Sequence, residues 1–432
     1  MSTNFDRRQF LLGSTALVAA GAVAPAFAQD PGRLRLYWWG GQARADRTNK
    51  VSDLFKSKVD PKVTIDGEYN GSFQDYWTKL DTQVAGNNTP DVLQMDYRYI
   101  YQYATKGTIL ALDDYIGKGL DLSDFDKDQI DGGRVGGKLY AISLGANSVA
   151  MMVNTAAFKE AGVDLPTPDW SYDDYKTASV AWNKANPRNG MRILQDGSGN
   201  EPAYENWLRQ RGKALYTADG KLAWTADDLV EWFKLWDDLR ANNVCVSPDN
   251  QALDANAAIE TTMITLGKAA TTFANSNQLI AFQKINKDPL TMVNFPRAKK
   301  GAGGGHYRKP SQFWSIASTT PAKDESVKYV SFFINDGDAG AALGVERGIP
   351  CAKHIRDAIA PTLSDQDRLA LNFVSNLGDL LGPLPPVPPA AAGEIDNELQ
   401  TKSQEVAFGQ STAEDAGPAF FKAATDMLAR SS

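Results

Sequence analysis

The chain has 432 residues, of which 43 % are hydrophobic, 22 % charged and 10 % aromatic, and its formal net charge at pH 7 is −7. At roughly 150 residues per domain, this length predicts two or three domains with buried cores. The acidic balance argues against nucleic-acid binding, which needs a basic patch, and a content of two histidines and two cysteines nearly excludes a His triad, a His-rich metal site or a disulfide scaffold.

Residues 1–28 predict an export signal. Arg7 and Arg8 precede an uncharged, mostly apolar stretch that ends at an A-x-A cleavage site, Ala26-Phe27-Ala28. This arrangement is typical of a secretory signal peptide, and the paired arginines are similar to a twin-arginine signal, although Asp6 stands where Ser or Thr is common. The stretch is short for a membrane span of about 20 residues. We therefore expect a mature protein that starts at residue 29 and is exported to a periplasm.

Predicted strands alternate with predicted helices along the mature chain, which favours an α/β architecture with mostly parallel sheets. The strands are expected at 34–39, 63–69, 91–96, 268–273 and 313–317, and the helices at 44–59, 73–84, 154–162, 172–185, 201–212, 227–242 and 323–334. The C-terminal part is predicted to be helical, apart from the Pro-rich segment 383–389. The Gly-rich run 301–305 lacks the Lys-Ser/Thr pair of a phosphate-binding loop, so we expect a surface hairpin there.

Polar and aromatic side chains gather where the predicted strands end. In open α/β sheets, ligands bind at the carboxyl ends of the strands. An aromatic ring packs against the apolar face of a sugar, while amides and carboxylates bond to its hydroxyls. This pattern predicts a carbohydrate site, although each residue also has a structural interpretation, such as core packing or helix capping. The candidates are Trp38, Trp39, Gln42, Ser72, Asp96, Tyr97, Asn275 and Trp314.

No sequence pattern indicates catalysis. We predict no catalytic residue, no metal ligand and no cofactor. A secreted glycosidase with two catalytic carboxylates remains an alternative, because their separation of about 5–10 Å is not set by sequence spacing.

Six short motifs, in this order and spacing, carry a family resemblance. They are 136–142 (GGKLYAI), 152–162 (MVNTAAFKEAG), 168–170 (PDW), 266–270 (LGKAA), 313–317 (FWSIA) and 347–350 (RGIP). With them the mature chain resembles the sugar-type extracellular solute-binding proteins of bacterial ABC importers, the maltose-binding-like class.

The resemblance implies an α/β fold of two lobes of the periplasmic binding protein type (type II-like), joined by crossing strands, with a helical C-terminal segment. The lobes are expected at 29–143 plus 312–345 and at 148–308 plus 346–432, with crossings near 143–148, near 309–313 and after the helix 323–334. The family position adds Asn147 and Arg347 to the candidates, whereas Ser143 stands where relatives often have Pro.

The implied function is a periplasmic receptor that binds a sugar, an oligosaccharide or a glycoside between its lobes. It delivers this ligand to the ABC permease in the inner membrane and works as a monomer, without a cofactor and without catalysis. A polyol, a sugar–glycerol conjugate or an anionic or sulfonated sugar are alternative ligands, since the guanidinium of Arg347 or Arg44 fits an acidic group. The alternative role of Arg347 is a structural salt bridge between the lobes. Whether Cys245 and Cys351 form a disulfide is left open by the sequence.

Overall fold

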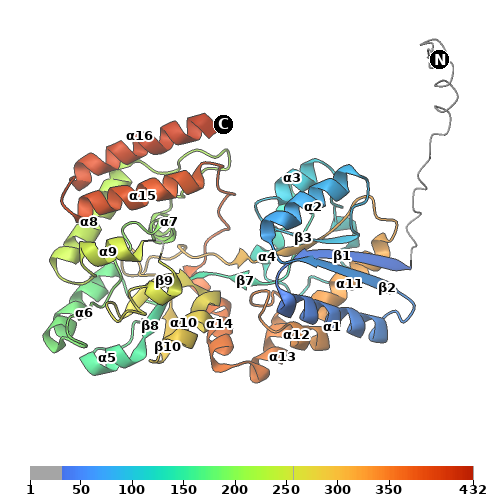
Figure 1. Cartoon of the computed structure of the whole chain (residues 1–432), viewed down its shortest axis with the longest axis horizontal. Helices are drawn as coiled ribbons and strands as arrows, with labels where there is room; N and C mark the ends of the chain where they lie inside the picture. The colour runs from blue at the N-terminus through green and yellow to red at the C-terminus, as the bar shows by residue number, and fades with distance from the viewer. Residues whose placement is uncertain (1–31, 256, 432) are drawn as a thin grey trace, which may run out of the picture.

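The computed structural model describes residues 32–255 and 257–431, which form two lobes (Figure 1). The expected two-lobe α/β fold is therefore confirmed. The predicted signal peptide, 1–28, lies outside the described residues. Within the described part, no helix is long and apolar enough to cross a membrane.

The N-terminal lobe is built on a five-stranded sheet in the order β2-β1-β3-β12-β6. β1 is parallel to β2 and β3, whereas β12 runs antiparallel to both β3 and β6. The expectation of mostly parallel sheets is wrong beyond the first three strands, because β12 enters this sheet from the other lobe. The strands are β1 (Arg33–Trp39), β2 (Thr64–Asn70), β3 (Val92–Met95), β6 (Ile142–Ser143) and β12 (Phe313–Ile316), with a separate β4–β5 pair (Arg134–Val135, Lys138–Leu139).

Helices cover both faces of this sheet. α2 begins where Ser72 Oγ accepts a hydrogen bond from the backbone N–H of Asp75 (3.2 Å), which satisfies one free donor of its first turn. α1 buries Val51 and Phe55 in the core of the lobe. The helices are α1 (Gln42–Lys58), α2 (Phe73–Ala85), α3 (Ile100–Thr105), α4 (Lys127–Asp131), α11 (Lys323–Asn335) and α12 (Gly337–Leu343), with a 3-10 turn η1 (Asp113–Tyr115).

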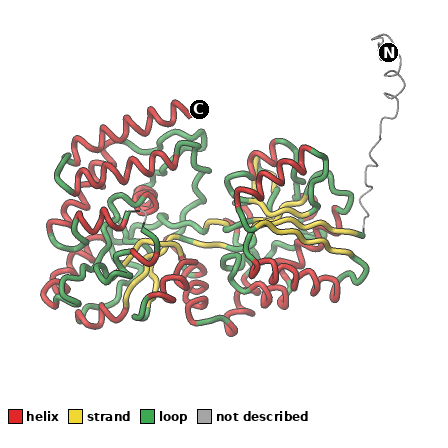
Figure 2. Tube along the Cα trace, viewed as in Figure 1, coloured by secondary structure: helices red, strands yellow, loops and turns green. Residues whose placement is uncertain are grey.

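The C-terminal lobe is mainly helical and surrounds a small antiparallel sheet in the order β10-β8-β9 (Figure 2). Its core is rich in tryptophan, with Trp232 and Trp236 edge to face at 5.6 Å. The strands are β8 (Val149–Asn154), β9 (Thr271–Asn275) and β10 (Leu290–Val293). The helices are α5 (Thr155–Ala161), α6 (Tyr172–Ala185), α7 (Glu201–Gln210), α8 (Ala226–Ala241), α9 (Pro248–Asp254), α10 (Leu279–Ile285), α13 (Lys353–Ile359), α14 (Asp365–Ser375), α15 (Ala392–Ala407) and α16 (Ala413–Ser431), with 3-10 turns η2 (Ile259–Thr261), η3 (Ser276–Gln278), η4 (Ala360–Thr362) and η5 (Gly378–Leu380).

Chain segments cross side by side between the lobes. β7 (Ala146–Asn147) pairs antiparallel with β11 (Lys309–Pro310), and Ala146 also forms a bridge to Ile349. Gly145 lets these segments approach, since a Cβ there would lie 2.3 Å from the carbonyl oxygen of Arg347. The crossings thus lie close to the three expected places, while the expected residue bounds of each lobe stay a prediction.

The Gly-rich run 301–305 is not a surface hairpin, so that expectation is wrong. Gly305 and His306 are buried, and the run lies along 379–382, where the Gly304 N–H donates to the Asp379 carbonyl (3.1 Å). A Cβ on Gly303 would lie 2.4 Å from that carbonyl oxygen. Gly303 and Gly305 are therefore needed for close packing, whereas Gly301 and Gly304 adopt positive φ in open space.

Candidate functional site

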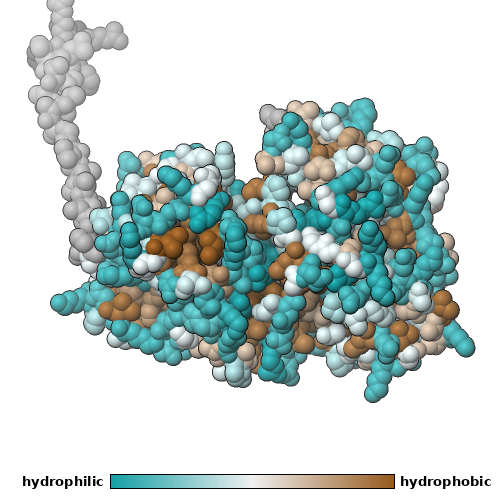
Figure 3. All heavy atoms as spheres, turned by 180° about the vertical axis from the view of Figure 1, so that it is seen from behind, coloured by the Kyte–Doolittle hydropathy of each residue, from teal (hydrophilic) through white to brown (hydrophobic). Residues whose placement is uncertain are grey.

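A cavity of about 380 Å³ lies where the two lobes meet, and we call it the cleft. Seen from behind, a notch separates the lobes on one side, while they touch on the other (Figure 3). The wall of the cleft combines side chains from α1, from the β3–α3 turn, from the crossing segments and from the end of β9. Its polar residues include Arg44, Asp96, Asn147, Asn275, Tyr307 and Lys309.

Four of the sequence-predicted residues come together in this wall: Asp96, Asn147, Asn275 and Arg347. The carboxylate of Asp96 accepts hydrogen bonds from the backbone N–H (2.9 Å) and Nε (3.0 Å) of Arg98, so it also fixes the turn before α3. The Asn147 side chain has no hydrogen bond to another described residue. Its amide is therefore available to bond to a ligand. That the four residues touch a ligand stays a prediction.

Arg347 holds the N-terminal lobe together from inside. Its guanidinium donates to Gln94 Oε1 (2.6 Å) and Thr48 Oγ1 (2.8 Å) and lies 5.3 Å from the centre of the Trp314 ring. Burial and the nearby Arg44 lower the pKa of Arg347 to about 9, so it stays cationic at neutral pH. Because both terminal nitrogens are bonded, Arg347 offers no free fork to an acidic ligand. These two hydrogen-bond partners are neutral, and Arg347 forms no ion pair with a described residue of either lobe.

Arg44 is also engaged. Its Nε lies 2.9 Å from Glu346 Oε1, and its Nη1 donates to the carbonyl of Trp39 (3.0 Å). Since Glu346 belongs to the third crossing, this ion pair ties α1 to that crossing.

The structure corrects the prediction for Trp38 and Trp314. Their exposed fractions are 1 % and 0 %, and the two rings meet edge to face at 6.5 Å in the core of the N-terminal lobe. Both lie on inner strands of the sheet, where helices cover the face on which these side chains stand. Neither ring can therefore stack against a ligand in the cleft.

The other predicted residues lie outside the wall of the cleft. Half-buried Trp39 packs on Tyr76 (5.1 Å between ring centres), and Gln42 Oε1 accepts a hydrogen bond from Tyr69 (2.7 Å). Ser72 caps α2, as described above. The Tyr97 hydroxyl donates to the carbonyl of Pro385 (2.9 Å), which joins the N-terminal lobe to the Pro-rich segment.

The wall of the cleft also holds polar residues that the sequence did not single out, among them Tyr307 and Lys309. The Tyr307 hydroxyl donates to Glu205 Oε2 (3.2 Å), and burial raises the pKa of Glu205. Lys309 is exposed and forms no ion pair with a described residue. Their position beside the second crossing was the available signal. The cleft thus offers amide, hydroxyl and ammonium groups to a polar ligand.

Metal and disulfide chemistry have no visible basis in the part of the chain that the structure describes. No group of three or more His, Cys, Asp or Glu side chains is arranged there to hold a metal ion. Cys245 and Cys351 are both buried free thiols, and Cys351 Sγ lies 3.3 Å from Ser143 Oγ.

Comparison with known proteins agrees with this architecture. Residues 50–365 match the family described as bacterial extracellular solute-binding protein. A family 1 extracellular solute-binding protein from Alicyclobacillus acidocaldarius subsp. acidocaldarius DSM 446 is 30 % identical, with a TM-score of 0.83 over 92 % of this chain and 98 % of the other. A periplasmic oligogalacturonide binding protein from Yersinia enterocolitica is 23 % identical (TM-score 0.76; 92 % and 99 % covered). The substrate-binding protein Lmo0181 from Listeria monocytogenes, solved with cycloalternan, is 20 % identical (TM-score 0.65; 92 % and 99 % covered). The chain belongs to the bacterial extracellular solute-binding proteins.

Proposed function

We propose that the protein is the periplasmic substrate-binding component of an ABC importer and that it captures a sugar, an oligosaccharide or a glycoside in the cleft. The observation that carries this proposal is a polar cleft whose wall comes from both lobes. The ligands in the descriptions of the Yersinia and Listeria proteins, an oligogalacturonide and a cycloalternan, are both carbohydrates and support it.

The mechanism follows from the position of the cleft. A ligand that touches both walls stabilises the closed arrangement of the lobes and shifts the equilibrium towards it. Closure removes water from the cleft, so that a few polar contacts select the ligand. The closed monomer then docks on the permease in the inner membrane, where another subunit hydrolyses ATP.

A thermal-shift screen of the mature chain, 29–432, against sugars, glycosides, polyols and sugar acids tests this function. A ligand at 100 times its dissociation constant stabilises the protein by about 2.7 kcal/mol. We expect one class of carbohydrate to raise the Tm and to be recovered unaltered. The double variant Asn147→Ala/Lys309→Ala should lose this shift, whereas Asn372→Ala, an exposed position on α14, should keep it. No shift with any carbohydrate contradicts the proposal, and a consumed sugar makes the protein a glycosidase.

The export route is part of the same proposal. The Arg7-Arg8 pair supports a twin-arginine signal. Replacing both residues with lysine should leave the protein in the cytoplasm, as measured by cell fractionation. Unchanged export would assign the protein to the general secretory route.

A further inference from the structure

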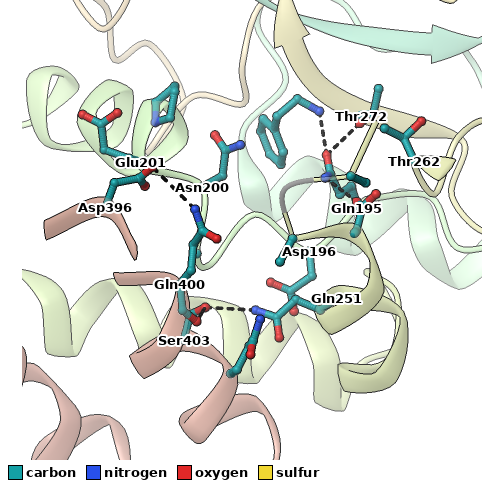
Figure 4. Close-up of a pocket in the computed structure, with 17 residues that line it drawn as sticks. Gln195, Asp196, Asn200, Glu201, Gln251, Thr262, Thr272, Asp396, Gln400 and Ser403 are labelled. Carbon is teal, nitrogen blue, oxygen red and sulfur yellow. Dashed lines mark hydrogen bonds between the residues drawn. The ribbon is translucent and has the colours of Figure 1, made fainter. Parts of the chain in front are cut away.

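A second cavity, of about 270 Å³, lies within the C-terminal lobe between α7, α9, α15 and β9 (Figure 4). We call it the carboxyl pocket, because its wall holds the carboxyl groups of Asp196, Glu201, Asp254 and Asp396. Amides and hydroxyls make up the rest of its polar wall, and none of the described residues that line it is a Lys, Arg or His. The pocket is therefore rich in acceptors and contains no cation of its own.

Among the described residues, Asp196 is the only one of these four carboxyl groups that forms an ion pair. Arg240 Nη1 lies 2.5 Å from Asp196 Oδ2. Glu201 and Asp396 form no ion pair with a described residue. Burial, with the neighbouring Glu205 and Asp396, raises the pKa of Glu201 to about 8, and burial raises the pKa of Asp254 to about 6. Burial thus disfavours the charged forms of Glu201, Asp254 and Asp396.

Gln251 provides a separate observation. This side chain lines the pocket and is only 5 % exposed. Its Nε2 donates to Ser198 Oγ (2.8 Å) and Ser403 Oγ (3.2 Å), whereas its Oε1 is buried with no hydrogen-bond partner among the described residues. A buried acceptor without a protein partner costs stability, and a donor group on a ligand would offset that cost.

The carboxyl pocket and the cleft are neighbours. Thr272 lines the pocket, and Asn275 on the same strand lines the cleft, a distance of about 10 Å along an extended chain. Lys309 of the cleft is also close enough to Glu201 to lower its pKa. The two cavities therefore lie at neighbouring places along β9.

We propose that the carboxyl pocket binds a protonated amino group, so that the captured solute is an amino sugar or a glycoside with a basic nitrogen. This inference rests on the proposed function and specifies its substrate class. An ammonium group has three donors and no acceptor, which suits a wall that holds several carboxyl groups and no cation. A hydroxyl bonds to the acceptors but does not stabilise the ionised form of the carboxyl groups as an ammonium group does, and the carboxylate of a uronic acid is disfavoured beside them.

Calorimetry with matched sugars tests this substrate class. The probes are glucosamine and its β-1,4-linked disaccharide, the N-acetylated form of each, glucose and cellobiose, and digalacturonic acid. We expect the free amines to bind at least tenfold more tightly than the acetylated and hydroxyl forms. Because a bound ammonium favours the ionised form of Glu201, we also expect proton release, seen as a binding heat that depends on the buffer at pH 7.

Variants of the pocket separate its role from folding. Glu201→Gln and Asp396→Asn should each abolish the preference for the amine and the proton release, with the Tm retained. Glu394→Gln is the matched control. Glu394 lies on α15 like Asp396, but it forms an exposed ion pair with Arg430. The inference is overturned if no amine binds more tightly than its acetylated or hydroxyl form. It is also overturned if none of the tested amines binds at all.

The results that would overturn the proposed function differ from those that would overturn this inference. Binding of neutral or acidic sugars without preference for the amine overturns only the inference and leaves the carbohydrate receptor standing. Putrescine, an amine without a sugar, serves as the last probe. If putrescine binds while no sugar does, both the proposed function and the amino-sugar assignment are overturned.

Discussion

Single residues of the cleft wall also serve the fold beneath it. Arg347 contacts the cleft, yet its guanidinium bonds to Gln94 and Thr48 and lies over Trp314 inside the lobe. Asp96 likewise combines a place in the wall with a structural turn. Such residues position the surface of the site, whereas Asn147 and Lys309 are freer to contact a ligand. Substitutions in the two groups should therefore affect different properties.

Trp314→Ala should destabilise the protein rather than weaken ligand binding directly. The ring is fully buried and packs against Phe333 at 5.6 Å. Its removal leaves a cavity and should lower the free energy of unfolding by about 3–5 kcal/mol, as measured by urea denaturation. Tyr101→Ala, at a side chain that is 65 % exposed, is the control and should change stability little. An unchanged urea midpoint for Trp314→Ala would contradict the core assignment.

His306 should make the protein less stable in mild acid. It is buried, its Nε2 accepts a hydrogen bond from the backbone N–H of Phe295 (3.2 Å), and burial lowers its pKa to about 3. As the pH falls below the ordinary value of about 6.5, the unfolded chain takes up a proton that the folded protein does not. The free energy of unfolding should then fall by about 1.4 kcal/mol per pH unit from this group.

Urea unfolding of wild type and His306→Gln between pH 6.5 and pH 4.5 measures this contribution. The variant should have the flatter pH profile. His354→Gln is a control of opposite sign, because hydrogen bonds to Asn335 and Asp124 raise the pKa of His354, so its stabilisation is present in acid and lost as the pH rises. Parallel profiles for wild type and His306→Gln would show that His306 is not held neutral.

Elements with a strong local pattern were predictable from the sequence. The helix expected at 172–185 is found as α6, since Ser171 and Asp174 form a capping box and Tyr175 and Trp182 face the core. The strand expected at 268–273 is found as β9 at Thr271–Asn275, after a turn in which Gly267 has a φ of +67°. The direction of β12 was not predictable from the sequence. The strand runs antiparallel to β3 and β6 because the chain enters this sheet from the C-terminal lobe.

The residues of the candidate site were likewise predictable only where a local sequence pattern marks them. Residues at strand ends, such as Asp96 and Asn275, were found because the end of a strand is a local signal. The burial of Trp38 and Trp314 depends on helices distant in sequence that cover the sheet. The carboxyl pocket combines α7 with α9 and α15, so no single stretch of sequence contains its pattern.

Gly145→Ala should disturb the crossing segments as a unit. The added Cβ would lie 2.3 Å from the Arg347 carbonyl oxygen, so one crossing must move. We expect a loss of stability of about 1–3 kcal/mol and weaker ligand binding, measured by urea unfolding and calorimetry. Gly393→Ala is the matched control, since a Cβ there meets nothing within 4 Å. If both variants behave alike, the close approach does not constrain the hinge.

On the scale of the whole molecule, the lobes touch near the crossings and are separated by a notch on the other side (Figures 1 and 3). A contact outside the crossings is the hydrogen bond from the Tyr97 hydroxyl to the carbonyl of Pro385 (2.9 Å). It connects the N-terminal lobe to the segment that leads into α15, which lines the carboxyl pocket. This bond restrains the separation of the lobes.

Tyr97→Phe should therefore open the unliganded protein. Without the hydroxyl the Pro385 carbonyl loses its donor, and small-angle scattering should give a larger radius of gyration than for wild type. Because one hydrogen bond contributes about 0.5–1.5 kcal/mol, ligand affinity should fall by up to about tenfold, as closure must then overcome a wider opening. Tyr101→Phe, at an exposed side chain on α3, should leave both quantities unchanged. Saturating ligand should reduce the radius of gyration of both variants to the same closed value. If Tyr97→Phe and wild type scatter identically without ligand, the crossings alone set the arrangement of the lobes.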